Sequence, residues 1–389
     1  MTLVRLGDAA RFINGAAFKP SDWVNEGLPI IRIQNLTGTG EHFNYTTRQV
    51  KDELVVEQGD LLVSWSATLD VYRWGGPRGL LNQHIFKVLP HLGVDPDFLY
   101  FALKSVIAEL QSKTHGSTMK HVVRGDFEGT CIQLPGIDEQ RRIVDLLSRA
   151  EGIVRLRRQA QQKVADLIPA MFIDTFGDPS TNAKQWAIHP LSEVADVISG
   201  VAKGRQLSAE ESIELPYMRV ANVKDGHLDM SEVKTISIKK TEVEKLRIVP
   251  GDLLMTEGGD PDKLGRAALW HGEIDLCVHQ NHIFKVRSYS DRLVPEYLRS
   301  LAGSAYGKAY FLSVAKKTTG IASINKTQLS AFPVLLPPLA NQTKFKLQVA
   351  AVERIVALQD AAARKAEATF GSLLARAFTE AGPQVHREM

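Results

Sequence analysis

Two stretches of the chain hold side chains that can contact nucleic-acid bases. Residues 64–78 read SWSATLDVYRWGGPR, which interleaves aromatic rings with guanidinium groups, and residues 256–271 offer cations and a histidine later in the chain. Arginine bonded to guanine is among the commonest direct base contacts. The alternative is that the aromatic rings pack beneath their own loop, which we favour for the tryptophans. The base-reading candidates are Ser64, Trp65, Tyr72, Arg73 and Arg78 in the first stretch and Lys263, Arg266 and His271 in the second.

Two other stretches suit the phosphate backbone of a duplex. Residues 113–124 (KTHGSTMKHVVR) and 317–326 (KTTGIASINK) mix glycine, hydroxyl groups and cations. Hydroxyls and lysines commonly hydrogen-bond phosphate oxygens. The alternative for either stretch alone is a solvated polar loop. The backbone candidates are Lys113, Ser117, Thr118, Lys120, Arg124, Lys317, Thr318, Thr319 and Lys326.

Motifs for catalysis, cofactors and metals are missing from the sequence. It has no G-x-x-x-x-G-K-[ST] phosphate loop, no G-x-G-x-x-G opening a helix, and no D/N-P-P-Y/F motif of the kind that clamps an amide. His279 and His282 would lie on opposite faces of a strand, so a structural or DNA-facing role is preferred to a metal site. Gly258–Gly259 stands between two carboxylates that would repel phosphate, which favours a simple turn. We therefore expect no catalytic residue, no cofactor and no metal.

The elements that position these stretches occur twice. LNQHIFKV at 81–88 matches HQNHIFKV at 279–286, and LPIIRIQNL at 28–36 matches LPYMRVANV at 215–223. GDLL recurs at 59 and 251, and LPGIDEQ at 134 matches LPPLANQ at 336. A repeat this long is a duplicated domain, which imitates a homodimer and suits a two-fold partner such as duplex DNA.

The duplication also sorts residues by role. Two domains that read different bases should share what builds the fold or holds phosphate, and should differ where they read sequence. The shared Gly-Asp pairs predict tight turns. Arg32 and Arg219, which precede Asn35 and Asn222, could bind phosphate or pair with a carboxylate, and the sequence leaves both possibilities open.

Each half is predicted to be a mixed α/β globule followed by a long helix. Apolar residues recur every three or four positions over 138–173 and again over 341–378, and Pro169 should kink the first helix. We expect an antiparallel coiled coil rather than two helices that each lie on their own domain. Its interface would contain Ile153, Leu156, Val164, Val352, Ile355 and Phe370. The predicted boundaries are 1–137 for the first domain, 138–178 for the first helical spacer, 188–338 for the second domain and 339–380 for the second spacer.

Composition limits the class of protein. The chain has 389 residues, 44% of them hydrophobic and 23% charged, which is typical of a globular protein of two or three domains. A net charge of +3 is compatible with nucleic acid without indicating it. Cys131 and Cys277 are interpreted as buried, reduced thiols. No apolar run is long enough for a membrane helix and the N-terminus lacks a signal peptide, so the cytoplasm is the expected location.

Two variable globules, each closed by an LP-x-x-x-x-Q motif and a long helix, resemble the specificity subunit of type I restriction-modification enzymes. LPPLANQ, the helix ending LLARAF, the GDLL turns and the LP-x-x-R-x-x-N strands bear this resemblance. It implies two target recognition domains that each read one half of a split site on double-stranded DNA. It also implies helices that space the domains and dock two methyltransferase subunits, with helicase-nuclease restriction subunits joining them, and no catalysis by the chain itself. The alternatives are a stand-alone methyltransferase or nuclease and a protein–protein interaction scaffold.

Overall fold

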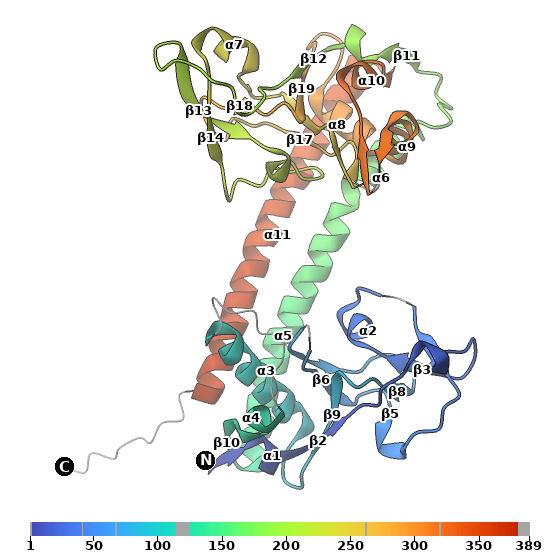
Figure 1. The fold of residues 1–389 in the computed structure, drawn as a ribbon, viewed down its shortest axis with the longest axis vertical. Coiled ribbons are helices and arrows are strands. Elements are labelled where there is room, and N and C mark those ends of the chain that lie inside the picture. The colour runs from blue at the N-terminus through green and yellow to red at the C-terminus, as the bar shows by residue number, and fades with distance from the viewer. Residues whose placement is uncertain are drawn as a thin grey trace, which may run out of the picture. The chain divides into compact units, whose positions relative to one another are not determined.

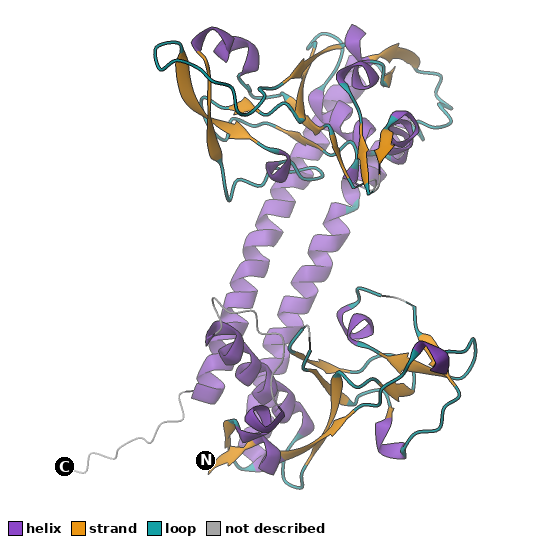
Figure 2. Ribbon diagram, viewed as in Figure 1, coloured by secondary structure: helices purple, strands orange, loops and turns teal. Residues whose placement is uncertain are grey.

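The computed structural model describes residues 2–40, 42–66, 68–113, 124–260, 263–318 and 320–379. The chain forms two compact units, drawn in Figures 1 and 2. Unit 1 comprises Met1–Gln159 and Ala361–Met389, and unit 2 comprises Ala160–Asp360. Each unit therefore contains one domain together with the start of one long helix and the end of the other.

Unit 1 is built on two four-stranded sheets. One sheet is antiparallel, with the order β2-β9-β6-β7, and the other has the order β4-β3-β8-β5 with β3 parallel to β8. Leu61 and Val63 of β6 face the core beneath helix α3, whereas Leu62 faces the core of the second sheet, so both faces of β6 are buried. The strands are β1 (Thr2–Arg5), β2 (Ala10–Asn14), β3 (Leu28–Ile31), β4 (Asn44–Thr46), β5 (Val55–Val56), β6 (Leu61–Ser64), β7 (Asp70–Arg73), β8 (Gly79–Leu81), β9 (Ile85–Pro90) and β10 (Cys131–Leu134), and the helices are α1 (Leu6–Ala9), α2 (Ile33–Thr37), α3 (Pro96–Lys113), α4 (Arg124–Gly129) and α5 (Ile137–Ala165).

Unit 2 repeats this plan. Its sheets β12-β19-β15-β17 and β14-β13-β18 have the same antiparallel and mixed pairings, and a further small sheet, β16-β21-β20, stands beside them. The strands are β11 (Ala187–Pro190), β12 (Ala195–Ser199), β13 (Ser212–Met218), β14 (Lys234–Lys239), β15 (Leu253–Thr256), β16 (Gly258–Gly259), β17 (Ala267–Leu269), β18 (Val278–His279), β19 (Ile283–Ser288), β20 (Lys316–Thr318), β21 (Ile321–Ser323) and β22 (Pro333–Leu336), and the helices are α6 (Leu167–Phe176), α7 (Val243–Leu246), α8 (Pro295–Gly303), α9 (Ala305–Val314), α10 (Lys326–Ser330) and α11 (Leu339–Thr379). The predicted duplication and mixed α/β class are confirmed.

The shared Gly-Asp pairs form tight turns, as predicted. Gly59 and Gly251 have φ values of 94° and 93°, a region that only glycine adopts without strain. The carboxylates that follow accept hydrogen bonds from backbone nitrogens three residues earlier, at 2.7 Å for Asp60 and 2.8 Å for Asp252. These turns belong to the fold and are not phosphate sites.

Another shared glycine is required because two backbone segments lie very close together. A Cβ atom at Gly15 would lie 2.1 Å from the carbonyl oxygen of Asn82, and one at Gly200 would lie 2.1 Å from that of His279. Backbone atoms at that distance leave no room for a side chain. Gly15 directly follows β2 and Gly200 directly follows β12, so each glycine holds the end of that strand against the residues that precede the HIFKV strand.

The first long helix is interrupted near its end. α5 stops at Ala165 and α6 starts at Leu167. Pro169 has no N–H to donate to the carbonyl of Ala165, and its ring clashes with that carbonyl, which accounts for the break. The predicted kink is confirmed, although the interruption, at Asp166, lies three residues before the proline.

Each long helix is fastened to its domain by a buried glutamine from the LP-x-x-x-x-Q motif. Gln140 accepts a hydrogen bond from the backbone N of Asp95 at 2.8 Å and donates to the carbonyl oxygens of Gly93 and Pro135 at 3.0 and 2.9 Å. Gln342 repeats all three contacts: it accepts from Val294 N at 2.9 Å and donates to the carbonyls of Arg292 and Pro337 at 3.2 and 2.8 Å. The side chains are 1% and 0% exposed, so no water replaces these bonds.

A second contact follows eleven residues further along each helix. Tyr100 donates a 2.6 Å hydrogen bond to Glu151, and Arg299 at the equivalent position donates a 2.8 Å hydrogen bond to Glu353. A tyrosine hydroxyl in unit 1 and a guanidinium in unit 2 thus bond the equivalent glutamate of the long helix. The start of each long helix is therefore fixed in both position and rotation on its own domain.

The end of one long helix packs beside the start of the other within each unit. In unit 1, Leu374 of α11 is buried in the same core as Ile143 and Leu147 of α5, and Arg158 pairs with Glu367 at 2.8 Å. In unit 2, Phe345 of α11 packs on Phe172 and Phe176 of α6, with ring centroids 5.8 and 5.3 Å apart. Residues rise along α5 as they fall along α11, so the pairing is antiparallel, as predicted.

The predicted interface residues divide into two groups. Val352 is buried, Phe370 packs on the unit 1 core and Val164 is half-buried. In contrast, Ile153, Leu156 and Ile355 are 53%, 60% and 43% exposed, so their assignment to the helix interface is wrong. The buried face of α5 runs through Ile143, Leu147 and Val154. Apolar residues at steps of three and four, such as Ile153 and Leu156, lie on a neighbouring face of the helix that is exposed.

Two further observations bear on the sequence expectations. No helix in the described ranges is long and apolar enough to cross a membrane. Cys277 is buried, which raises the pKa of its thiol to about 12, whereas Cys131 is exposed. The expectation of two buried thiols is therefore wrong for Cys131, because it occupies the exposed first position of the short strand β10.

We expect Gln342→Ala to loosen the first turns of α11. The change leaves one backbone N–H and two carbonyls buried without partners, which should cost about 2–4 kcal/mol. Hydrogen exchange at residues 339–345, together with urea unfolding, measures the effect. The exposed Gln162 on α5 supplies the matched control, and equal exchange in Gln342→Ala and Gln162→Ala would contradict the role of the glutamine.

Candidate nucleic-acid interface

Each predicted base-reading stretch is divided between two ends of a hairpin. In unit 1, β6 and β7 are joined by residues 65–69, whereas residues 74–78 lie at the opposite end. There the backbone N–H of Gly59 donates to the carbonyl of Trp74, and that of Trp74 donates to the carbonyl of Asp60. In unit 2, Thr256 donates its backbone N–H to Arg266 at one end, and Trp270 donates to Asp252 at the other. Neither stretch forms one continuous surface.

Ser64 and Trp65 have structural roles. Ser64 is fully buried at the end of β6, where its hydroxyl donates to the carbonyl of Thr68 and accepts from Asp70 N at 3.2 Å. Trp65 stacks on Phe86, with centroids 5.8 Å apart and an interplanar angle of 26°. The base-reading assignment of Ser64 is wrong because both faces of β6 are covered, and the preference for a packed tryptophan is confirmed.

Arg73 is held in a network between three elements. Its guanidinium donates to Asp97 at 2.8 Å and Glu151 at 3.3 Å and lies 3.7 Å from the ring centroid of Tyr100. Burial and the neighbouring Glu151 raise the pKa of Tyr100, so its hydroxyl remains a donor. Arg73 thereby ties β7 to α3 and α5, and a base-reading role for it is wrong in this arrangement.

The remaining members of the first stretch are less enclosed. Tyr72 is half-buried, which raises its pKa, and it lines a cavity of about 380 Å³ together with Phe43 and Trp74. Arg78 is exposed beside Glu57, at 3.2 Å, next to the Gly-Asp turn. Arg78 is therefore the member of this stretch that solvent reaches most readily, but it stands far along the hairpin from Trp65.

The three candidates of the second stretch also separate. Lys263 pairs with Asp260, which lowers the pKa of that carboxyl, and Arg266 is half-buried at the same end of the β15–β17 hairpin. His271 is exposed at the opposite end, where its backbone N–H donates to Glu273 at 3.0 Å. Lys263 and Arg266 therefore remain together, without His271.

The backbone candidates are only partly described. Ser117, Thr118, Lys120 and Thr319, together with the side chains of Lys113 and Thr318, lie outside the described residues. Arg124 starts α4 and donates to Glu128 at 2.8 Å and to the carbonyl of Phe12 at 2.9 Å, which gives it a structural task. Lys317 on β20 and Lys326 at the start of α10 are exposed.

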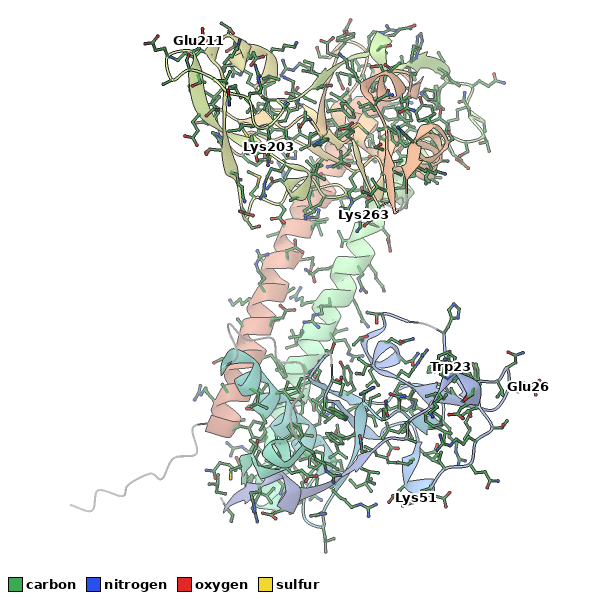
Figure 3. All side chains as sticks on the ribbon, in the orientation of Figure 1. Trp23, Glu26, Lys51, Lys203, Glu211 and Lys263 are labelled. Carbon is green, nitrogen blue, oxygen red and sulfur yellow. The ribbon has the colours of Figure 1, made fainter. Side chains whose placement is uncertain are left out.

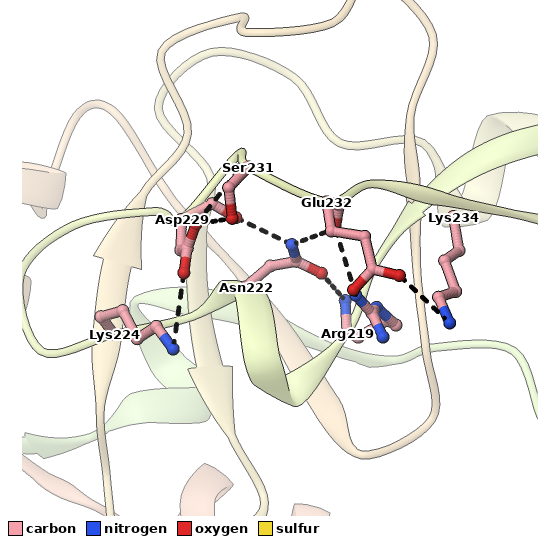
Figure 4. Close-up of polar contacts among 7 residues, drawn as sticks. All are labelled: Arg219, Asn222, Lys224, Asp229, Ser231, Glu232 and Lys234. Atoms are coloured by element: carbon pink, nitrogen blue, oxygen red, sulfur yellow. Dashed lines mark hydrogen bonds and ion pairs between the residues drawn. The ribbon is translucent and has the colours of Figure 1, made fainter. Parts of the chain in front are cut away.

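The shared arginine and asparagine close a loop in each unit, shown for unit 2 in Figure 4. Asn222 accepts from Arg219 N at 3.0 Å and donates to the carbonyls of Asp229 and Glu232 at 2.8 and 2.9 Å. The guanidinium of Arg219 bonds the Glu232 carboxylate at 2.8 Å, which lowers the pKa of that carboxyl. The sequence left open whether Arg219 binds phosphate or pairs with a carboxylate. In the structure of unit 2 it pairs with a carboxylate.

Arg32 in unit 1 has a different neighbour. Asn35 repeats the loop closure with Arg32 N at 3.0 Å, but the guanidinium of Arg32 lies over the Trp23 ring at 5.6 Å. Trp23 is 42% exposed at the edge of unit 1 (Figure 3). In unit 2, Lys203 lies over Tyr217 instead, at 5.4 Å. The repeat gives no signal for this exposed cation–aromatic pair, because Trp23 has no counterpart among the matched residues of the second half.

The two histidines have separate structural settings. His279 is fully buried between the carbonyls of Leu246 and Ile198, and burial lowers its pKa to about 4. His282 pairs with Glu257 at 2.7 Å. The side chains point into different surroundings, as the strand geometry predicted, and the described part of the chain contains no group of three or more His, Cys, Asp or Glu side chains that could hold a metal.

Comparison with known proteins agrees with this architecture. A family model described as "Type I restriction modification DNA specificity domain" matches residues 1–165. The type I restriction enzyme EcoBI specificity subunit of Escherichia coli is 22% identical over 412 aligned positions, which cover 96% of this chain and 85% of that protein. The putative MjaX specificity subunit of Methanocaldococcus jannaschii is 26% identical over 160 residues, which cover 41% of this chain and 37% of that protein.

Over nearly its whole length, the chain is similar to specificity subunits of type I restriction-modification systems.

Solved structures of specificity subunits share the fold. The S subunit from M. genitalium aligns with a TM-score of 0.53 at 14% identity and covers 97% of this chain and 96% of its own. A structure described as "Structural basis underlying complex assembly and conformational transition of the type I R-M system" aligns with a TM-score of 0.56 at 18% identity and covers 97% of both chains. Two tandem domains, each followed by a long helix, are thus the architecture of the family.

Within this fold, the two units differ at the ends of β6 and β15 that lead into Trp65 and Glu257. Trp65 and His84 form an aromatic pair in unit 1, with centroids 5.6 Å apart, whereas Glu257 and His282 form a polar pair at the same positions in unit 2. The buried glutamines and the Gly-Asp turns are the same in both units. This end of each domain is therefore the candidate surface for reading different sequences.

Arg73→Ala should destabilise unit 1 by about 1–2 kcal/mol without changing which DNA sequence is read. The loss follows from two hydrogen bonds to carboxylates and one cation–aromatic contact. Urea unfolding, followed by tryptophan fluorescence, measures the stability. Arg78→Ala is the control and should change stability by less than about 0.5 kcal/mol, because it removes a single exposed ion pair. A stable Arg73→Ala protein with altered sequence preference would contradict the structural assignment.

Proposed function

We propose that this chain is the DNA-recognition and assembly subunit of a type I restriction-modification complex. Each domain reads one half of a split target on double-stranded DNA. The observation that supports this most is the pair of units with one fold, the same helix anchors and different residues at the open end of β6 and β15. Similarity to specificity subunits over nearly the whole chain supports the same conclusion. The proposed recognition domains are residues 1–137 and 188–338.

Two equivalent surfaces on the long helices suit two copies of one partner. Ile153 and Leu156 stand thirteen and sixteen residues after Gln140, and Ile355 and Leu358 stand at the same distances after Gln342. All four are apolar and exposed, at 53%, 60%, 43% and 71%. Apolar side chains that recur at equivalent exposed positions mark a binding surface better than single ones do. We assign these surfaces to two methyltransferase subunits, with restriction subunits joining the assembled complex.

The chain contributes recognition, and its partners contribute chemistry. The sequence has no nucleotide or methyl-donor motif, and Ser64, Arg73 and Arg124 are engaged in structural contacts. DNA is the substrate of the proposed complex, so we place the chain in the cytoplasm. Arg78, Lys263, Arg266, Lys317 and Lys326 are the exposed or half-buried cations that we retain as DNA-contact candidates.

The chain on its own should neither methylate nor cleave DNA. Purified chain is incubated with DNA and labelled methyl donor, alone and then with its methyltransferase subunits. Methyl transfer should require those subunits. Activity of the chain alone would establish the stand-alone enzyme instead, and absence of DNA binding in every combination would favour a protein-interaction scaffold.

Ile153→Asp with Leu156→Asp should remove one of two bound methyltransferase subunits, and Ile355→Asp with Leu358→Asp should do the same. A charge placed in an apolar contact is desolvated without a partner. Native mass spectrometry counts the subunits in each complex, and circular dichroism checks that the helices persist. Ser148→Asp, exposed on α5 outside this stripe, is the control. A complex that keeps both subunits in either double variant would show that these surfaces are not the docking sites.

A further inference from the structure

A short hairpin in unit 2 carries polar and apolar side chains away from the core. Strands β20 and β21 pair antiparallel, with Lys316 opposite Ser323, Lys317 opposite Ala322 and Thr318 opposite Ile321. The hairpin joins β16 to form a three-stranded sheet. It follows α9 directly and leads into α10, so it is attached to the domain at both ends.

Two glycines allow the hairpin to pair beside the end of β15 that leads into Glu257. They are Gly258 and Gly259, which pair with Ser323 and Ala322 of β21. A Cβ at Gly258 would lie 2.7 Å from the carbonyl oxygen of Ala322, and Ile324 N donates to the carbonyl of Glu257 at 2.8 Å. Ser66 and Ala67 occupy the positions equivalent to Gly258 and Gly259 in unit 1. A side chain at the first of these positions would block the pairing, so unit 1 lacks the glycines on which this sheet depends.

Burial distinguishes the two faces of the hairpin. Opposed residues in an antiparallel pair share one face of the ribbon. Ala322 is fully buried, so the face of Lys317 and Ala322 is turned to the domain. Lys316, Ile321 and Ser323 lie on the other face, where Lys316 is exposed and Ile321 is 57% exposed.

The surroundings of the hairpin favour a polyanion. Residues 314–328 contain Lys316, Lys317 and Lys326 and no acidic residue. Lys263 lies beside the same sheet, since a Cβ at Gly259 would be 3.7 Å from its Cβ, and it is labelled in Figure 3. Lys263 is paired with Asp260 and His282 with Glu257, so Lys316, Lys317 and Lys326 supply the positive charge of this region.

We infer that the outward face of the β20–β21 hairpin reads base edges of one half-site in the major groove. A two-stranded ribbon fits that groove, lysine donates to guanine O6 and N7, serine bonds either donor or acceptor, and an aliphatic side chain contacts the thymine methyl group. Lys316, Ser323 and Ile321 are the reading residues, and Lys317 supplies charge from the other face. This inference rests on the proposed function and assigns specificity in unit 2 to residues outside the 256–271 stretch.

The test compares charge-matched variants on opposite faces of one ribbon. Full-length wild type, Lys316→Gln, Ile321→Ala, Ser323→Ala and Lys317→Gln are each expressed with the methyltransferase subunits, and methylated sites are sequenced. Lys316→Gln, Ile321→Ala or Ser323→Ala should relax one half-site at one or two positions, with discrimination there falling about 10-fold or more, while the other half-site stays unchanged. Lys317→Gln should weaken methylation of all sites alike.

Two outcomes would overturn the inference. One is an unchanged motif in all three outward-face variants; the other is a Lys317→Gln variant that relaxes the same positions. Hydrogen exchange over residues 316–324 verifies that the hairpin persists, and Ser323→Ala is the variant that disturbs it least. If the wild-type complex yields no split motif, the proposed function fails; if it does and the variants leave it intact, only the hairpin assignment fails.

Discussion

The structure depends on one buried side chain in each half, the glutamine that closes the LP-x-x-x-x-Q motif. Gln140 and Gln342 each use one acceptor and two donor bonds to join three backbone segments: the final strand, the loop before α3 or α8, and the start of a long helix. A buried amide with this many bonds tolerates no rotation, because each lost bond leaves an unpaired backbone group. The direction of the helix at its origin is therefore set by the domain. Leucine could fill the same space but would fix nothing.

Duplication of this anchor separates what the protein holds constant from what it can vary. The Gly-Asp turns, the close-packed Gly15 and Gly200, and the asparagines that close a loop after β3 and β13 are the same in both units. The open end of the central hairpin differs, with Trp65 in one unit and Glu257 in the other. A family that must recognise many DNA sequences needs such a division, because changes at the open end leave the anchors and the cores intact.

Polar residues in the base-reading stretches show how readily a binding motif can be a structural one. Arg73 has the side chain and the sequence neighbours expected of a base-reading residue. Its guanidinium is nevertheless bonded to Asp97 and Glu151 and lies against the ring of Tyr100. Ser64 is enclosed because β6 lies between two cores. In both cases the decisive partner is more than three residues away in sequence, and for Glu151 it is 78 residues away. Spacing along the chain carries no information about such partners.

The sequence by itself determined the duplication, the mixed α/β class, the antiparallel long helices, the break near Pro169 and the family. Each of these depends on local patterns: repeated sequence motifs, apolar residues spaced three or four positions apart, and the missing N–H of a proline. The tertiary structure alone decided which face of each helix is buried: Ile153 and Val154 are apolar neighbours in the sequence, yet only Val154 is buried. It also decided which cations are available, because a guanidinium is occupied or open according to carboxylates that the fold brings from elsewhere. The hairpin β20–β21 illustrates the same limit. Its polar residues can be identified from the sequence, but which of them face outward follows from the burial of Ala322 against the rest of unit 2.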